Sequence, residues 1–318
     1  MTKEKKLHKQ HKKLDNAIIY VVLILISIIW LFPFFCIVMQ SLHPLSEGGG
    51  ISGNIFPTSH FSFENYKYLF TASPEFLGWY KNTFIIAFFV AIGQTCMVLM
   101  VSYALSRMRF KGRNFIMRFW LILGMFPGFL SMICLYFLLK QFGLTQDGAV
   151  PGLILIGVAS SGMGYYVCKG YFDTIPKSLD EAARIDGATR SRIFFTMICP
   201  LAKPMIIYTA LTAFMAPWND YIFASYVAFG KSSKYNVAVG LFQWINNNDY
   251  QGFFTRFCAG GVTVAIPVTI LFLLLQKYYV EGVTGGAVKG RKWFILITKK
   301  CCLARKPHTL HWEHAGQT

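Results

Sequence analysis

Six long stretches of this chain contain almost no charged side chain, and they restrict its fold more than any other feature. They cover residues 16–39, 82–106, 119–139, 148–168, 204–230 and 257–276, and among them only the fifth contains a charge, at Asp220. About 20 apolar residues in a helix cross the ~30 Å hydrocarbon core of a membrane. Hydrophobic residues make up 54% of the chain and charged residues 14%, which argues against a soluble globular domain. The sequence therefore predicts an all-α integral membrane protein with six transmembrane helices.

The basic residues predict how these helices are oriented. The chain has 31 Lys and Arg against 14 Asp and Glu, a net charge of +17. With the N-terminus inside, the tail 1–15, the loops after the second and fourth stretches and the C-terminal tail contain 25 of these 31 residues. Cytoplasmic segments carry such an excess, so both termini are predicted to be cytoplasmic in a multi-pass protein of the cell (inner) membrane. Nucleic-acid binding is disfavoured because the charges are scattered over several loops without a recognised binding fold.

The loop after the fourth stretch, residues 177–204, is polar and has the features of a short helix. Ser178 and Glu181 have the spacing of a capping box and follow Pro176, which predicts a helix start near Ser178. Gly187 is placed to end this helix in a left-handed turn. A helix of two turns is marginal in water, so it needs packing against the membrane helices or a partner.

The side chains of this helix indicate what such a partner would contact. Small residues, among them Ala182 and Ala183, let the surface of another protein approach the backbone, while Asp180, Glu181 and Arg184 add charge. The alternative is an ordinary amphipathic loop helix that rests on the membrane surface.

The pattern Glu181-Ala182-Ala183, Gly187 and Pro200 resembles the E-A-A loop of permease subunits in ATP-binding-cassette (ABC) importers. One departure is Cys199, where that family usually has a leucine. The resemblance implies the type I ABC importer permease (MetI-like) fold, in which the E-A-A helix fits a groove on a separate ATPase. It also implies that this loop couples the permease to the ATPase through Ser178, Leu179, Glu181, Ala182, Ala183, Asp186, Gly187 and Pro200.

Other stretches extend the resemblance over a single permease domain, residues 16–290. Trp79-Tyr80-Lys81-Asn82-Thr83, Tyr103-Ala104-Leu105-Ser106-Arg107 and Trp218-Asn219-Asp220 are similar to the second permease of carbohydrate importers, most of all the maltose/maltodextrin branch. Such a subunit and a homologous second permease each form half of a pore in the lipid membrane. Their further partners are two ATPase subunits and an extracellular sugar-binding protein. The tail 291–318 does not fit this family and is expected to be an accessory cytoplasmic extension.

The chain lacks the motif expected of an ATPase. A P-loop needs G-x-x-x-x-G-K-[ST] because backbone amides and a lysine hold the phosphates. The nearest match, Gly230-Lys231-Ser232, has Ser225 in place of the first glycine. ATP and Mg²⁺ are therefore expected on the partner ATPase, with no cofactor and no catalytic residue in this chain. His308, His311 and His314 are regularly spaced, but no further pattern supports a metal site.

Asn219 and Asp220 are candidates for lining the translocation path. A charge at mid-bilayer costs roughly 2.5–3.5 kcal/mol on insertion scales, so such residues usually face a cavity or a partner. The alternative is that Pro217 ends the regular helix and Asp220 lies near the outer interface.

The loop 230–251 is a candidate contact for the external binding protein. In maltose permeases, to which the chain is similar, the comparable loop reaches into that protein. Aromatic rings stack on the C–H faces of sugars, and amides pair with their hydroxyl groups. The candidate residues are Trp244, Asn246, Asn247, Asn248 and Asp249. The alternative is a plain aqueous turn, since Asn and Asp are ordinary loop residues.

Three rival functions stay open on the sequence alone. The same machinery could import another oligosaccharide or glycerol phosphate, although an anionic substrate would favour a basic cavity and no Lys or Arg lies within a stretch. An ion-coupled secondary transporter predicts inverted repeats and several charges within the membrane. A membrane anchor or receptor has no use for the E-A-A pattern.

Overall fold

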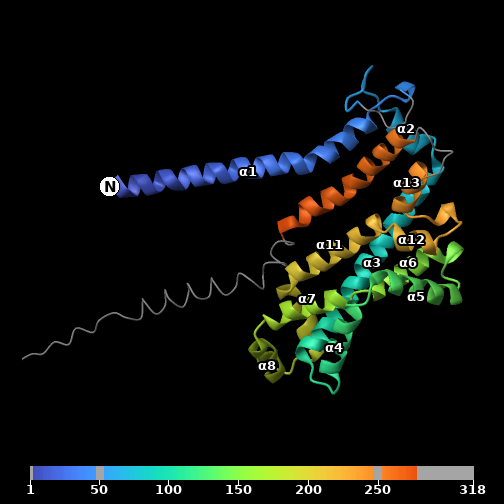
Figure 1. Ribbon diagram of the computed structural model, residues 1–318. Coiled ribbons are helices and arrows are strands. Elements are labelled where there is room, and N and C mark those ends of the chain that lie inside the picture. Colours follow the sequence, from blue (N-terminus) through green and yellow to red (C-terminus); the bar gives the residue numbers. More distant parts are fainter. Residues whose placement is uncertain (1–2, 48–53, 247–252, 278–318) are drawn as a thin grey trace, which may run out of the picture. The chain divides into compact units, whose positions relative to one another are not determined.

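The computed structural model describes residues 3–47, 54–246 and 253–277, with side chains from residue 16 onward. Within these ranges every regular element is helical, as the sequence predicts (Figure 1). The helices are α1 (Lys3–Ser41), α2 (Glu64–Thr71), α3 (Pro74–Arg107), α4 (Arg113–Gly124), α5 (Gly128–Gln141), α6 (Ala149–Ala159), α7 (Gly162–Asp173), α8 (Lys177–Ile185), α9 (Arg190–Ile193), α10 (Cys199–Leu201), α11 (Lys203–Asn219), α12 (Ile222–Val227), α13 (Val237–Asn246) and a last helix, Phe254–Lys277. Shorter turns are π-helical (Phe194–Ile198) or 3-10 (Leu45–Glu47, Gln146–Gly148, Ser232–Lys234).

Four helical segments of the described chain are long and apolar enough to cross a membrane: Asn16–Ser41, Pro74–Arg107, Gln146–Asp173 and Phe254–Lys277. The count rises to 6 if each of two bent helix pairs is one span: Arg113–Gly124 with Gly128–Gln141 (bent by 104°), and Arg190–Leu201 with Lys203–Asn219 (bent by 82°). The four long segments contain or closely match the predicted first, second, fourth and sixth stretches.

The other two predicted stretches are not continuous helices. The third is broken between α4 and α5, where Pro127 precedes the first residue of α5. The fifth is broken at Asp220, because α11 ends at Asn219 and α12 begins at Ile222. Hydropathy alone does not register such breaks, since both interrupted stretches are apolar on either side.

The chain divides into two compact units. The first contains the chain up to Met97 together with Ile122–Ser161 and Ala210–Leu274, and the second contains Val98–Leu121 and Gly162–Thr209. Helices α3, α4 and α11 each contribute residues to both units.

In the first unit, aromatic side chains pack α13 against α3. The ring of Trp244 lies 5.4 Å from that of Trp79 and 6.1 Å from that of Phe76, measured between centroids. Gly240 allows this approach, because a Cβ at this position would lie 2.0 Å from the Trp79 ring. The segment 237–246, predicted to be part of a loop, is therefore a packed helix.

A second contact in the first unit joins α3 to α6 through glycine. A Cβ on Gly93 would lie 2.6 Å from the Val158 side chain, and one on Gly157 would lie 2.5 Å from that of Val90. Small residues let membrane helices approach each other closely. This contact forms one wall of the cavity that contains Asp220.

The second unit has a buried cluster of its own around the end of α3. Its members come from α3, α7, α8 and the segment 190–205, and they include Tyr103, Phe172, Ala183, Ile193 and Met205. Ala183 is the contribution of α8 to this cluster. The cluster therefore determines which face of α8 is turned inward.

Candidate coupling site

Helix α8 begins one residue earlier than predicted. It runs from Lys177 to Ile185, with Pro176 at the N-cap, and no side chain caps its first turn. The predicted capping box of Ser178 and Glu181 is therefore wrong, because Ser178 lies inside the first turn rather than before it. The φ of −57° at Pro176 is already close to the helical value, and the helix starts directly after it.

The C-terminal end of α8 agrees with the prediction. Gly187 has a φ of +80°, the left-handed conformation that favours glycine. The backbone N–H of Gly187 donates to the carbonyl of Arg184 (3.0 Å), and that of Ala188 donates to the carbonyl of Ala183 (2.9 Å). This pair of bonds is the Schellman motif, which satisfies the free carbonyls at the end of the helix.

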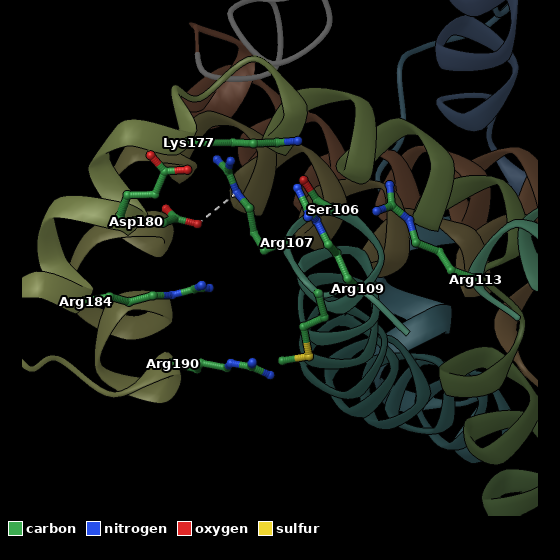
Figure 2. A pocket seen from close by; sticks show the side chains of 10 residues that line it. Ser106, Arg107, Arg109, Arg113, Lys177, Asp180, Arg184 and Arg190 are labelled. Carbon is green, nitrogen blue, oxygen red and sulfur yellow. Dashed lines mark ion pairs between the residues drawn. The ribbon is translucent and has the colours of Figure 1, made fainter. Parts of the chain in front are cut away.

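One side of α8 is held by a buried ion pair. Asp180 is 5% exposed, and its Oδ2 lies 3.4 Å from Nε of Arg107, the last residue of α3 (Figure 2). Nη2 of Arg107 also donates to the carbonyl of Phe172 (3.0 Å), in the last turn of α7, and to that of Ile175 (2.9 Å), in the turn between α7 and α8. A single guanidinium therefore joins the end of α3 to the turn before α8 and to α8 itself.

A second set of polar contacts joins α3 to α7. The hydroxyl of Ser106 donates to Oδ1 of Asp173 at 2.6 Å, and Nζ of Lys169 donates to Oδ2 at 2.6 Å. At the end of α3, Ser106 therefore contacts α7, and its neighbour Arg107 contacts both α7 and α8. Sequence reasoning assigned no role to Arg107 or Asp173. The position of Arg107 directly after the charge-free stretch 82–106 could have indicated a contact at the end of that helix.

The opposite side of α8 is exposed. Ile185 is 87% exposed, an unusual position for a large aliphatic side chain in water, and Leu179 is also exposed. Ala182 lies between these two residues in sequence and is exposed as well. These three residues form a small apolar face, here called the outer face of α8.

The other predicted coupling residues are distributed as follows. Ser178, Glu181, Asp186 and Gly187 are exposed, whereas Ala183 is 8% exposed and packs into the buried cluster of its own chain. Pro200 is exposed and lies in α10. Ala183 therefore supports α8 from within and does not present its side chain on the outer face.

The two candidate translocation residues separate in the structure. Asp220 lines a cavity of about 400 Å³ in the first unit, together with Gln94, Ser131 and Asn236 among others, whereas Asn219 does not line this cavity and is exposed. Oδ1 of Asp220 accepts from the backbone N–H of Phe223 at 3.2 Å, at the start of α12. The Asp220 backbone carbonyl accepts from Nδ2 of Asn236 at 2.6 Å. Pro217, offered as a helix end, lies inside α11 two residues before its end.

The predicted contact with a binding protein is not supported at Trp244. This side chain is 2% exposed and packs among the aromatic rings of α3, so it belongs to the core of the first unit. Asn246 is exposed at the end of α13. Asn247, Asn248 and Asp249 lie outside the described residues. Within the described ranges, no three His, Cys, Asp or Glu side chains gather in a way that could hold a metal ion.

Comparison with known proteins identifies the family. The family described as "Binding-protein-dependent transport system inner membrane component" matches residues 97–284. The chain is 37% identical over 274 residues to the galactooligosaccharides transport system permease protein GanQ of Bacillus subtilis (strain 168), covering 85% of this chain and 94% of the relative. It is 34% identical over 279 residues to the maltodextrin transport system permease protein MdxG of the same organism, covering 88% and 98%.

A solved structure gives the fold. The crystal structure of a bacterial ABC transporter involved in the import of the acidic polysaccharide alginate matches with a TM-score of 0.72 and 24% identity, covering 85% of this chain and 98% of that one. The chain therefore has the fold of an ABC importer permease and is a multi-pass membrane protein rather than an enzyme. It belongs to the family of binding-protein-dependent transport system inner membrane components.

Proposed function

We propose that this chain is one of two permease subunits of an ABC importer that takes up an oligosaccharide, driven by ATP and Mg²⁺ bound to a separate ATPase. The observation that carries the proposal is the way α8 is held. One side is joined to α3 through Asp180 and Arg107, and the other side presents a small apolar face with nothing of the described chain upon it.

In this mechanism the outer face of α8 is the contact for the ATPase. When the ATPase subunits close on ATP, they would move α8 as a rigid body, because the Schellman motif and the ion pair leave it little freedom of its own. The movement would pass through Arg107 into α3, which is one continuous helix over Pro74–Arg107. We infer that α8 and both chain termini lie on the cytoplasmic side, a proposal supported by the distribution of Lys and Arg along the sequence.

The cavity containing Asp220 supports a neutral sugar as the substrate. Its lining mixes hydrogen-bonding side chains, such as Gln94, Ser131 and Asn236, with apolar ones, and contains no Lys or Arg. Amides and hydroxyls pair with sugar hydroxyls, whereas a glycerol phosphate would need a cation. The named relatives are a galactooligosaccharides permease at 37% identity and a maltodextrin permease at 34% identity, so both sugars are candidate substrates. The motifs quoted from the sequence resemble the maltose/maltodextrin branch.

The test is reconstitution of the full chain in proteoliposomes with its second permease, its ATPase and its external binding protein. We expect uptake of labelled galactooligosaccharide or maltodextrin that requires ATP and stops when ADP replaces it. Asp220→Asn should reduce uptake because it removes the charge in the cavity while keeping an acceptor for Phe223. Asn219→Ala, outside the cavity, is the matched control and should behave as the unmodified chain.

The competing function makes the opposite forecast in the same vesicles. An ion-coupled transporter would take up sugar under an ion gradient with no ATPase present. Uptake of that kind would overturn the proposal.

A further inference from the structure

A second cavity, of about 390 Å³, lies in the second unit and is strongly basic. It is bounded by the end of α3, the first residue of α4, and helices α8 and α9. Ten residues line it, and the basic ones are Arg107, Arg109, Arg113, Lys177, Arg184 and Arg190. Figure 2 shows Lys177, Arg184 and Arg190 extending from α8 and α9 toward the end of α3. Asp180 and Glu181 are the acidic residues in this lining.

The positive charge of this basic cavity is not balanced by the chain around it. Asp180 pairs with Arg107. Arg113 also interacts electrostatically with the carboxylate of Asp173, which already accepts hydrogen bonds from Ser106 and Lys169. Within the described part of the chain, no carboxylate oxygen lies within ion-pair distance of the other five cations. Cations gathered around one cavity repel each other unless an anion enters it.

Buried donors in the basic cavity also lack acceptors. The Arg107 side chain is 2% exposed, and its Nη1 makes no hydrogen bond although Nη2 makes two. Nε of Arg113 is likewise buried without an acceptor. Nε of Arg107, which faces Asp180, and Oδ1 of Asp180 also make no hydrogen bond with the described chain. Buried polar groups in folded proteins nearly always have a partner, so the unpaired guanidinium donors of Arg107 and Arg113 in one cavity point to a missing acceptor. An acceptor with several oxygen atoms and a negative charge would satisfy these donors and offset the surrounding cations.

We propose that the basic cavity binds a phosphate group, from the headgroup of an anionic phospholipid or from a free phosphate. Guanidinium groups match the geometry of phosphate oxygens through paired hydrogen bonds, and five of the six cations are arginines. The location favours the lipid, because α3 contains no charged residue from Asn82 to Ser106 and the cavity lies where this spanning helix ends. Basic pockets at the ends of membrane helices are typical binding sites for anionic headgroups.

A phosphate in the basic cavity would act as a positioning ligand for α8. It would connect Arg109, in the loop after α3, and Arg113, at the start of α4, to Arg184 and Arg190, on α8 and α9. The ligand would thereby add a second link between α8 and α3, beside the Arg107–Asp180 pair. The proposal is independent of the transported substrate, since it concerns binding to the permease itself.

The experiment compares three forms of the full chain, purified in complex with its second permease and ATPase. The variant Arg184→Gln/Arg190→Gln removes two exposed cations from the basic cavity. The control Arg192→Gln removes an exposed cation from the same short helix, α9, that does not line the cavity. Elution on size-exclusion chromatography checks that each complex is assembled.

Binding is measured in two arms. In nanodiscs, native mass spectrometry counts retained phosphatidylglycerol against a phosphatidylcholine background; in detergent, calorimetry titrates inorganic phosphate at constant ionic strength. The unmodified chain and Arg192→Gln should bind at least one of these ligands. Arg184→Gln/Arg190→Gln should bind that ligand with an affinity at least about tenfold lower. Retention of the lipid without binding of phosphate identifies the headgroup as the source, and binding of phosphate in detergent identifies a free phosphate.

Two results would overturn the proposal. One is that the unmodified complex binds neither phosphatidylglycerol nor phosphate. The other is that Arg192→Gln weakens binding as much as Arg184→Gln/Arg190→Gln does, because the effect would then reflect overall charge rather than this cavity.

Discussion

At the scale of single residues, Arg107 is the most constrained side chain near α8. It is buried, it pairs with Asp180, and it donates to the carbonyls of Phe172 and Ile175. Its position at the last residue of α3 means that one side chain fixes three segments at one point. Because three segments depend on this one side chain, loss of either Arg107 or Asp180 should lower the stability of this region.

Asp180→Asn should lower the free energy of unfolding of the second unit by about 3–5 kcal/mol, the usual cost of leaving a buried charge without its partner. Thermal unfolding in detergent measures the change. Glu181→Gln, at the neighbouring exposed position, is the control and should change stability by less than about 0.5 kcal/mol. Equal stability of the two variants would show that the ion pair does not hold α8.

Gly187 carries a different constraint, since its φ of +80° is unfavourable for any residue with a Cβ. No atom of the described chain lies within 4 Å of a Cβ built there, so the cost of Gly187→Ala is backbone strain alone, about 1–2 kcal/mol.

Gly187→Val adds a branched side chain at the end of α8. We expect it to uncouple ATP hydrolysis from sugar uptake while the protein still inserts in the membrane. Normal uptake per ATP hydrolysed would contradict the coupling role of α8.

At the scale of helices, the packing of α13 on α3 depends on Gly240. Because a Cβ at this position would lie 2.0 Å from the rigid ring of Trp79, Gly240→Ala must displace one of the two helices. We expect a loss of about 1–3 kcal/mol in stability, as is typical of overpacking. Gly261→Ala is the control, because nothing lies within 4 Å of its added Cβ. Similar melting temperatures for the two variants would show that the contact between α3 and α13 is loose.

At the scale of the whole molecule, the sequence predicted the features that depend on local chemistry. Charge-free stretches located the apolar segments, and a glycine after a short helical pattern located the left-handed turn at Gly187. The breaks near Pro127 and at Asp220 were missed because hydropathy averages over them. Trp244 was placed on the surface because the neighbouring run of Asn and Asp dominated the pattern, whereas its burial depends on residues of α3 far away in the sequence. The Arg107–Asp180 pair was missed for the same reason.

The coupling role proposed for α8 depends on contact between its outer face and an ATPase. The most direct measurement is disulfide cross-linking of Ile185→Cys to cysteines placed around the groove of the co-expressed ATPase, in a chain whose own cysteines are replaced. Ala183→Cys, two residues away on the same helix but buried, is the matched control. We expect an ATP-sensitive cross-link at position 185 that blocks sugar uptake, and none at position 183. A cross-link at 183 but not at 185, or at neither position, would contradict it.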